Sequence, residues 1–136
     1  MPDMYGKGKK GKATKLHSKV IRTIGMCERC GDADYERLQC AHIIGRKYNA
    51  TRTDLRNAFC LCATCHAFFT DHPVEFGKFV ARTWANTYYD HLKELARPGT
   101  KGTDAFWDDR IVFLESVYEQ IQAGEMTVQD AREYED

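Results

Sequence analysis

Two Cys-x-x-Cys pairs, Cys27 with Cys30 and Cys62 with Cys65, constrain the fold of this chain more than any other sequence feature. A two-residue spacer allows a tight turn to point both thiolates at one ion, and two such turns complete a tetrahedral site. We therefore expect one structural zinc ion bound by these four cysteines. Four buried free cysteines would need two accidental spacings, and a thioredoxin-like redox role would leave one pair unexplained.

The cysteines also bear on the compartment of the protein. A chain with six cysteines could be a secreted disulfide scaffold, but no apolar stretch follows Met1 and the longest apolar runs are only a few residues. We therefore expect an intracellular protein of the host cytoplasm, with no signal peptide and no membrane contact. Cys40 and Cys60 lie in short apolar runs, where we expect them to be small buried residues.

The size and charge of the chain limit its function further. Its 136 residues, 43% of them hydrophobic, fit one domain and exclude a multidomain enzyme with separate lobes. The net charge is zero, yet residues 1–22 carry seven Lys or Arg against one Asp, and residues 104–136 carry ten Asp or Glu against two Arg. We expect residues 1–12 to be a basic flexible arm, which either follows a nucleic-acid backbone or is simply solvated.

Hydrophobic periodicity predicts several helices and two short strands. The predicted helices are 13–24, 62–70, 73–85, 86–95 and 104–124, and the predicted strands are 37–44 and 58–61 with a basic loop between them. We expect residues 13–96 to form one domain that contains both cysteine turns. Residues 97–136 are then an acidic helical extension packed on the same domain.

The chemically reactive residues lie between the cysteine pairs and beside them. His42 lies near the end of the first predicted strand after Cys40-Ala41, Asn57 precedes the second, and His66 directly follows Cys65. In this order the segment "LQCAHIIGRKYNATRTDLRNAFCLCATCHAFFTDHPVEF" resembles the HNH, or His-Me finger, endonucleases. It is most similar to small phage-type HNH proteins related to the NinG recombination nucleases, over about residues 14–96. The resemblance implies an α+β fold class with a zinc-stapled ββα-metal core and flanking α-helices.

The resemblance also implies a role for each reactive residue. His42 would take the proton from water, Asn57 would accept a hydrogen bond from the other ring nitrogen, and His66 would bind a catalytic divalent metal. A neutral imidazole at physiological pH suits the first role. Each residue also has a structural alternative: His42 a satisfied surface or core group, Asn57 the end of the loop, and His66 a fourth zinc ligand that displaces a cysteine.

One position departs from the family pattern. Many HNH enzymes have an acidic residue or a second His directly before the general base, and this chain has Ala41 there. The second protein ligand of the catalytic metal is therefore open between Asp71, His72 and His42 itself. Oxygen ligands would suit Mg²⁺ or Mn²⁺, and imidazole a softer transition metal. Without any of them, the metal would be bound loosely and supported by the DNA phosphate.

Basic residues are concentrated in the loop between His42 and Asn57. Because arginine forks match phosphate oxygens, we expect the DNA backbone to contact this loop and the basic arm. The predicted contacts are Lys12, Arg46, Lys47, Arg52 and Arg56. The function implied is a metal-dependent endonuclease that nicks or cuts duplex or branched DNA. The alternatives are a non-catalytic zinc module that binds nucleic acid and a phage assembly adaptor, and a phage protein partner or a homodimer stays open.

Overall fold

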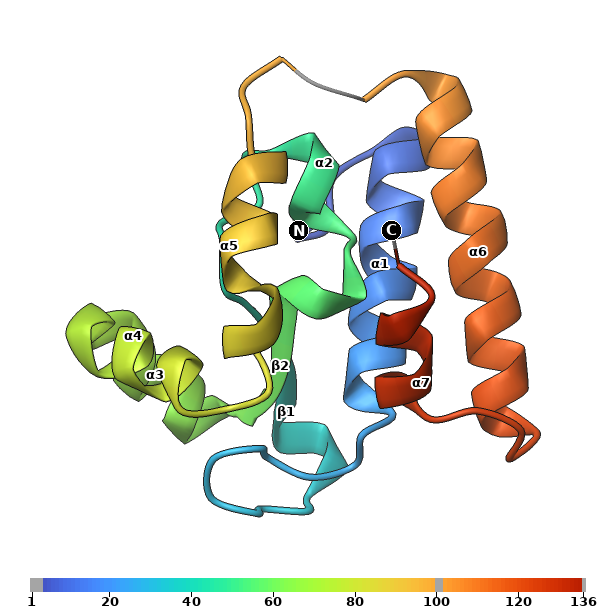
Figure 1. Ribbon diagram of the computed structural model, residues 1–136. Helices are drawn as coiled ribbons and strands as arrows, with labels where there is room; N and C mark the ends of the chain where they lie inside the picture. The colour runs from blue at the N-terminus through green and yellow to red at the C-terminus, as the bar shows by residue number, and fades with distance from the viewer. Residues whose placement is uncertain (1–3, 100–101, 136) are drawn as a thin grey trace.

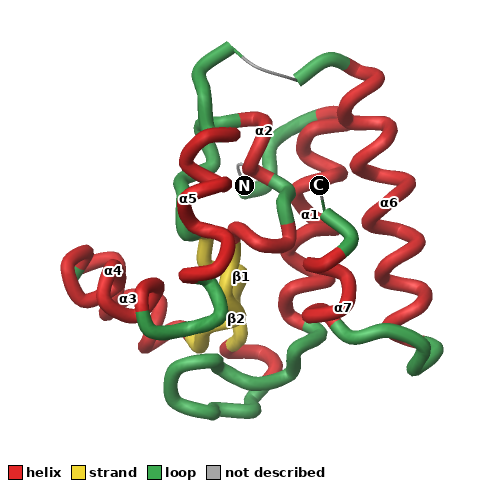
Figure 2. The backbone as a smooth tube through the Cα atoms, in the orientation of Figure 1, coloured by secondary structure: helices red, strands yellow, loops and turns green. Residues whose placement is uncertain are grey.

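A computed structural model describes residues 4–99 and 102–135 of the chain (Figure 1). A small β-hairpin lies at the centre, with helices around it (Figure 2). The elements in chain order are α1 (Gly8–Arg22), the 3-10 turn η1 (Tyr35–Arg37), β1 (Leu38–His42), α2 (Asn49–Arg52), the 3-10 turn η2 (Leu55–Asn57), β2 (Ala58–Cys62), α3 (Ala63–Asp71), α4 (Pro73–Ala81), α5 (Asn86–Leu95), α6 (Asp104–Gln122) and α7 (Val128–Glu133). This architecture confirms the predicted α+β fold class.

The two strands and the helix that follows them form the predicted ββα unit. β1 and β2 pair antiparallel, with Leu38 opposite Cys62 and His42 opposite Ala58. No loop separates β2 from α3, because the Cys62 side chain accepts a hydrogen bond from the Cys65 backbone N–H and so caps the helix. All residues of β2 are buried. The hairpin lies between α1 on one side and α3 on the other (Figure 1).

Aromatic and aliphatic residues from distant segments form the core around the hairpin. The ring of Phe59 packs against Phe79 and Trp84, at centroid distances of 4.8 and 5.0 Å. α6 lies along α1 (Figure 1), and its Leu114 belongs to the same buried cluster as Ile21 of α1. The acidic C-terminal region therefore contributes directly to the core of the fold.

The first helix begins earlier than predicted. Gly8–Lys12 are the first residues of α1, so the prediction of a flexible arm is wrong for this part of residues 1–12. The segment before the helix is held in place, because the Arg46 guanidinium donates to the Met4 carbonyl (2.6 Å) and Arg52 donates to the Tyr5 carbonyl (2.9 Å). Residues 1–3 of the predicted arm lie outside the described residues.

The observed elements differ from the predicted ones in three further places. The basic loop contains α2 and η2, and the helix that begins at Pro73 ends at Ala81. Sequence reasoning missed α7, although Thr127 and Asp130 form a reciprocal capping box at its start. Thr103 caps α6, since its hydroxyl accepts from the Phe106 backbone N–H.

Within residues 4–99 and 102–135, no helix has both the length and the apolar character that crossing a bilayer requires.

Candidate metal centre and catalytic cleft

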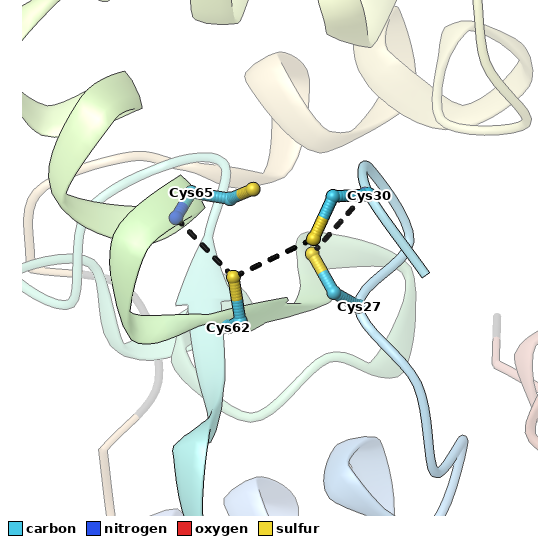
Figure 3. A group of neighbouring side chains, drawn as sticks. All are labelled: Cys27, Cys30, Cys62 and Cys65. Atoms are coloured by element: carbon cyan, nitrogen blue, oxygen red, sulfur yellow. Dashed lines mark hydrogen bonds between the residues drawn. The ribbon is translucent and has the colours of Figure 1, made fainter. Parts of the chain in front are cut away.

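The four cysteines of the two Cys-x-x-Cys pairs converge at one end of the hairpin (Figure 3). Their sulfur atoms all lie within 4.8 Å of one another. Cys27 and Cys30 lie in the turn after α1, whereas Cys62 ends β2 and Cys65 lies in the first turn of α3. In each pair the backbone N–H of the second cysteine donates to the sulfur of the first, at 3.5 Å for Cys30 and 3.4 Å for Cys65. The two pairs thus form two similar turns that face each other.

The spacing of these sulfur atoms fits a tetrahedral metal ion. The Sγ atoms of Cys30 and Cys62 are 3.7 Å apart, and two sulfurs at about 2.3 Å from a tetrahedral zinc ion lie about 3.8 Å from each other. All six cysteines of the chain are free thiols. Four sulfur donors suit a soft or borderline ion such as zinc, and they do not suit Mg²⁺ or Ca²⁺. The cluster could therefore hold a structural zinc ion.

The thiols of this cluster differ in how readily they ionise. Burial opposes ionisation of Cys27, but backbone N–H donors to its sulfur lower its pKa to about 7. Burial raises the pKa of Cys65 to about 12, although the Arg29 guanidinium donates to its sulfur. An incoming ion must displace protons from such thiols, so we expect metal affinity to fall as the pH falls.

Cys62→Ser removes one sulfur ligand and changes the cap of α3. We expect zinc to fall from one ion per chain to almost none after dialysis. Because structural zinc contributes several kcal/mol, the melting temperature should fall by at least about 10 °C. Cys60→Ser is the matched control, since Cys60 lies on the same strand outside the cluster and should keep its zinc. Full zinc in the Cys62 variant by elemental analysis would contradict the assignment.

His42 and His66 lie beside a common cleft. The cleft has a volume of about 520 Å³, and its lining includes His42 of β1, His66 of α3 and Arg46 of the following loop. The two histidines also line a smaller adjoining hollow. The predicted base and the predicted metal ligand are therefore available to one bound group.

A backbone carbonyl fixes the tautomer of His42. Its Nε2 donates a hydrogen bond to the Arg52 carbonyl oxygen (2.8 Å), which leaves the lone pair on Nδ1. Burial lowers the pKa of His42 from 6.5 to about 4; the charges of Arg46 and Arg52 also lower it, and the Arg52 carbonyl opposes the shift. The ring is therefore neutral near pH 7 and able to accept a proton.

The ring nitrogens of His42 can be observed directly by ¹⁵N-edited NMR. We expect a protonated Nε2 and an unprotonated Nδ1 at pH 7. Since the pKa is lowered by burial, the neutral form should persist until the pH falls to about 4. The urea-unfolded chain is the control, in which the same ring should titrate near the ordinary value of about 6.5. A folded-state titration near that value, or a proton on Nδ1, would disagree with the structure.

Asn57 acts on the loop and not directly on the His42 ring. It is fully buried. Its Oδ1 accepts from the Ile44 backbone N–H (2.8 Å), and its Nδ2 donates to the carbonyls of Ile44 and Thr51 (3.0 Å each). The predicted hydrogen bond from His42 to Asn57 is wrong, because the His42 ring donates to the Arg52 carbonyl instead. Asn57 ties together the two ends of the loop that carries this carbonyl.

His66 presents one free ring nitrogen. Its Nδ1 donates to the Gln39 side-chain oxygen (2.7 Å), so the lone pair lies on Nε2, and burial lowers its pKa. Asp71 and His72 are the other candidate ligands of the catalytic metal. His72 is engaged elsewhere, because its Nδ1 donates to the Phe68 carbonyl (2.8 Å) and its ring stacks on the Phe68 ring. Among the described residues, His66, Asp71 and His72 do not form a three-ligand cluster.

Two of the arginines that were predicted to contact phosphate, Arg56 and Arg52, instead form hydrogen bonds within the protein. The prediction for Arg56 is wrong, because this residue is only 5% exposed and its guanidinium binds both carboxylate oxygens of Asp54 (2.9 and 2.6 Å). Arg52 is half-buried and donates to the Thr14 hydroxyl (2.8 Å) and the Tyr5 carbonyl (2.9 Å). By contrast, Lys12 and Lys47 are exposed, and Arg46 is exposed although its guanidinium also donates to the Met4 carbonyl.

A buried arginine of α7, which sequence reasoning missed, supports the same region. Arg132 is 3% exposed and donates to the carbonyls of Leu55 (2.9 Å) and Ala58 (3.0 Å). Its guanidinium lies 3.6 Å from the Trp84 ring centroid. These contacts fix the turn η2 directly after the loop that orients His42.

A pair of charged residues, Arg110 and Glu135, also supports the turn η2. Arg110 of α6 forms an ion pair with Glu135 (2.7 Å), and Glu135 also accepts from the Leu55 backbone N–H (2.8 Å). Arg110 donates to the Thr53 side chain as well (3.0 Å). The sequence signal was that Arg110 and Arg132 are the only two basic residues of residues 104–136.

Arg132→Ala would leave two buried carbonyls without their donor. We expect a loss of about 2–4 kcal/mol in the free energy of unfolding, measured by urea denaturation. Arg97→Ala is the control, since Arg97 is exposed and its removal should change stability by less than about 0.5 kcal/mol. Equal effects of both substitutions would show that the buried contacts of Arg132 contribute nothing to stability.

Comparison with known families identifies the same unit. Residues 27–76 match the model of the HNH endonuclease family. This range holds both cysteine pairs, the hairpin and α3, whereas α1, α5, α6 and α7 lie outside it. No curated protein and no solved structure matches the chain. The family match therefore covers the ββα unit and not most of the helices around it.

Proposed function

We propose that this protein is a metal-dependent HNH endonuclease that hydrolyses DNA phosphodiester bonds. The observation that carries the proposal is the pair of neutral imidazoles, His42 and His66, on one cleft within the residues that match the HNH endonuclease family. The phage-type origin, the relation to NinG nucleases and the nicking or cutting of duplex or branched DNA belong to the same proposal. The resemblance of residues 38–76 supports them.

The chain's own residues can perform the proton transfer of this reaction. Nδ1 of His42 accepts the proton of the attacking water, and Nε2 stays bonded to the Arg52 carbonyl, which stabilises the imidazolium that forms. Arg46, on the cleft lining, can bind a phosphate oxygen. When bound at Nε2 of His66, a divalent ion such as Mg²⁺ or Mn²⁺ supplies positive charge to the phosphate. With one assigned protein ligand, we expect its affinity to be low.

His42→Ala should abolish cleavage without loss of DNA binding. The side chain is required only in the transition state, so the single-turnover nicking rate should fall by roughly 10²–10⁴-fold. His66→Ala should instead raise the metal concentration for half-maximal activity, with partial rescue by excess metal. Asn57→Ala should slow nicking less than His42→Ala, because it loosens the loop but keeps the base. The measurement is plasmid nicking across a Mg²⁺ titration.

A non-catalytic zinc module that binds nucleic acid is the second candidate. Ala41, buried before His42, favours it because this position offers no metal ligand. Nicking assays of the wild type and of His42→Ala distinguish the two candidate functions. Wild-type-like nicking by His42→Ala, or no nicking by the wild type with Mg²⁺ or Mn²⁺ while DNA binding persists, would favour the zinc module.

Exposed basic residues near the cleft should make DNA binding depend on salt. If Lys47 contacts a phosphate, Lys47→Gln should reduce the slope of log affinity against log salt by about 0.9. The same is expected for Lys12→Gln. Lys93→Gln on α5 is the control, since Lys93 is exposed but lies outside both α1 and the basic loop between His42 and Asn57. An unchanged slope for Lys47→Gln would exclude this contact.

The compartment and the partners are proposed on related grounds. The six free thiols support an intracellular site of action, because an oxidising compartment favours disulfide formation among neighbouring thiols. DNA is the proposed partner of the cleft. A phage protein or a second copy of the chain could use the exposed acidic residues of α6, such as Asp109 and Glu115. A pull-down with these two residues replaced by Asn and Gln tests that partner.

A further inference from the structure

We propose that His17, Cys40 and His42 form a second metal site, which takes a thiophilic transition ion such as Zn²⁺. One ligand atom from each residue lies within 4.8 Å of the other two. Cys40 and His42 alternate along β1 and therefore point to the same face of the hairpin. His17 comes from α1, outside the residues that match the HNH family. The site is thus distinct from the four-cysteine cluster and from His66.

The distance between the ligand atoms of His17 and Cys40 fits a tetrahedral ion. Nδ1 of His17 lies 3.7 Å from Sγ of Cys40. A nitrogen and a sulfur ligand at about 2.0–2.3 Å from a tetrahedral zinc ion lie about 3.5 Å apart. Two imidazoles and one thiolate form a donor set that favours Zn²⁺, Co²⁺ or Cu⁺ over Mg²⁺.

Both imidazoles are already oriented as metal ligands. Nε2 of His17 bonds to the Asp54 carbonyl (2.9 Å), and Nε2 of His42 bonds to the Arg52 carbonyl (2.8 Å). Each ring therefore donates from Nε2 to a backbone carbonyl and keeps its lone pair on Nδ1. Histidines that bind metals commonly show this arrangement, because the second hydrogen bond fixes the ring and its tautomer. The two carbonyls belong to the loop that Asn57 holds together.

The buried imidazole of His17 has a polar partner at each nitrogen, the Asp54 carbonyl at Nε2 and the Cys40 sulfur at Nδ1. The residue is 0% exposed on a helix face that also buries Ala13, Val20 and Ile21. An imidazole in this place is unfavourable unless polar groups engage both of its nitrogens. Cys40 and His42 line the cleft, so an ion can enter from solvent and keep one open coordination position.

Ion binding at this site is a proton exchange. The Cys40 thiol loses its proton to solvent as the sulfur–metal bond forms. Only an ion with strong affinity for sulfur displaces the proton of a neutral thiol near pH 7. Mg²⁺ lacks this affinity and leaves the site free.

The site has a functional consequence that rests on the proposed nuclease activity. The Nδ1 lone pair of His42 cannot accept a proton from water while it binds a metal. A thiophilic ion at His17, Cys40 and His42 therefore inhibits cleavage, whereas Mg²⁺ supports it. We infer an inhibitory site that makes the enzyme sensitive to Zn²⁺ above the level that fills the four-cysteine cluster.

Cobalt binding tests the site without reference to activity. The full chain, loaded with one zinc ion, is titrated with Co²⁺, and the expected result is a second bound ion with a sulfur-to-cobalt charge-transfer band. Elemental analysis of the same samples shows that zinc stays in place. Cys40→Ser should lose the band, and His17→Gln should weaken binding by about tenfold or more. Cys60→Ala is the matched control, since Cys60 is paired opposite Cys40 on β2 but lies outside the group.

The outcomes of the titration decide the site. No second cobalt ion in the wild type, or an unchanged band in Cys40→Ser, would overturn the proposal and leave a simple hydrogen bond between Cys40 and His17. If Cys40→Ser is unfolded by circular dichroism, His17→Gln and Cys40→Ala make the same comparison. Wild-type binding by every folded variant of Cys40 and His17 would also overturn it.

Zinc inhibition of nicking tests the functional consequence. With Mg²⁺ present, excess Zn²⁺ should inhibit the wild type. Relative to its own nicking rate in Mg²⁺ alone, Cys40→Ser should need at least about tenfold more Zn²⁺ for half-maximal inhibition than the wild type does. Equal zinc sensitivity of the two proteins would exclude the inhibitory role. If the wild type nicks no DNA at all, the proposed function fails, and the cobalt titration still decides the metal site.

Discussion

The convergence of four sulfur atoms at one end of the hairpin is the constraint on which the rest of the fold depends. A two-stranded hairpin is at best marginally stable in water, and β1 and β2 are only five residues long. An ion bound by the four sulfurs would join the turn after α1 to the start of α3, would close a long loop and would fix the hairpin between them.

The surrounding helices determine how accurately the cleft residues are held. Buried guanidinium groups need several partners to offset their desolvation, and Arg132 and Arg56 find theirs in the turn η2 and its flanks. These bonds, with those of Asn57, immobilise the backbone from Thr51 to Ala58. As a result, the carbonyls of this segment act as fixed acceptors for imidazole rings on α1 and β1.

Local signals in the sequence predicted the hairpin, α3 and the four-cysteine cluster, because each depends on spacing within a few residues. Contacts between distant segments were not predictable in the same way. Arg56 resembled a phosphate contact because the sequence does not show that this residue is buried, with its guanidinium paired to Asp54. Asn57 was assigned to His42, since the sequence does not show that the intervening loop folds back and places a carbonyl there.

The three groups of potential ligands in this small fold differ in chemical softness. The first offers four sulfurs, the second offers two imidazoles with one sulfur, and the third is His66 with the oxygens of a bound phosphate. Ions that prefer sulfur are drawn to the first two, and ions that prefer oxygen are left to the third. Because His42 belongs to the second group and also faces the cleft of the third, its one lone pair cannot serve both. On the two proposals made above, the preference of the available ion would determine whether His42 acts as a ligand or as a base.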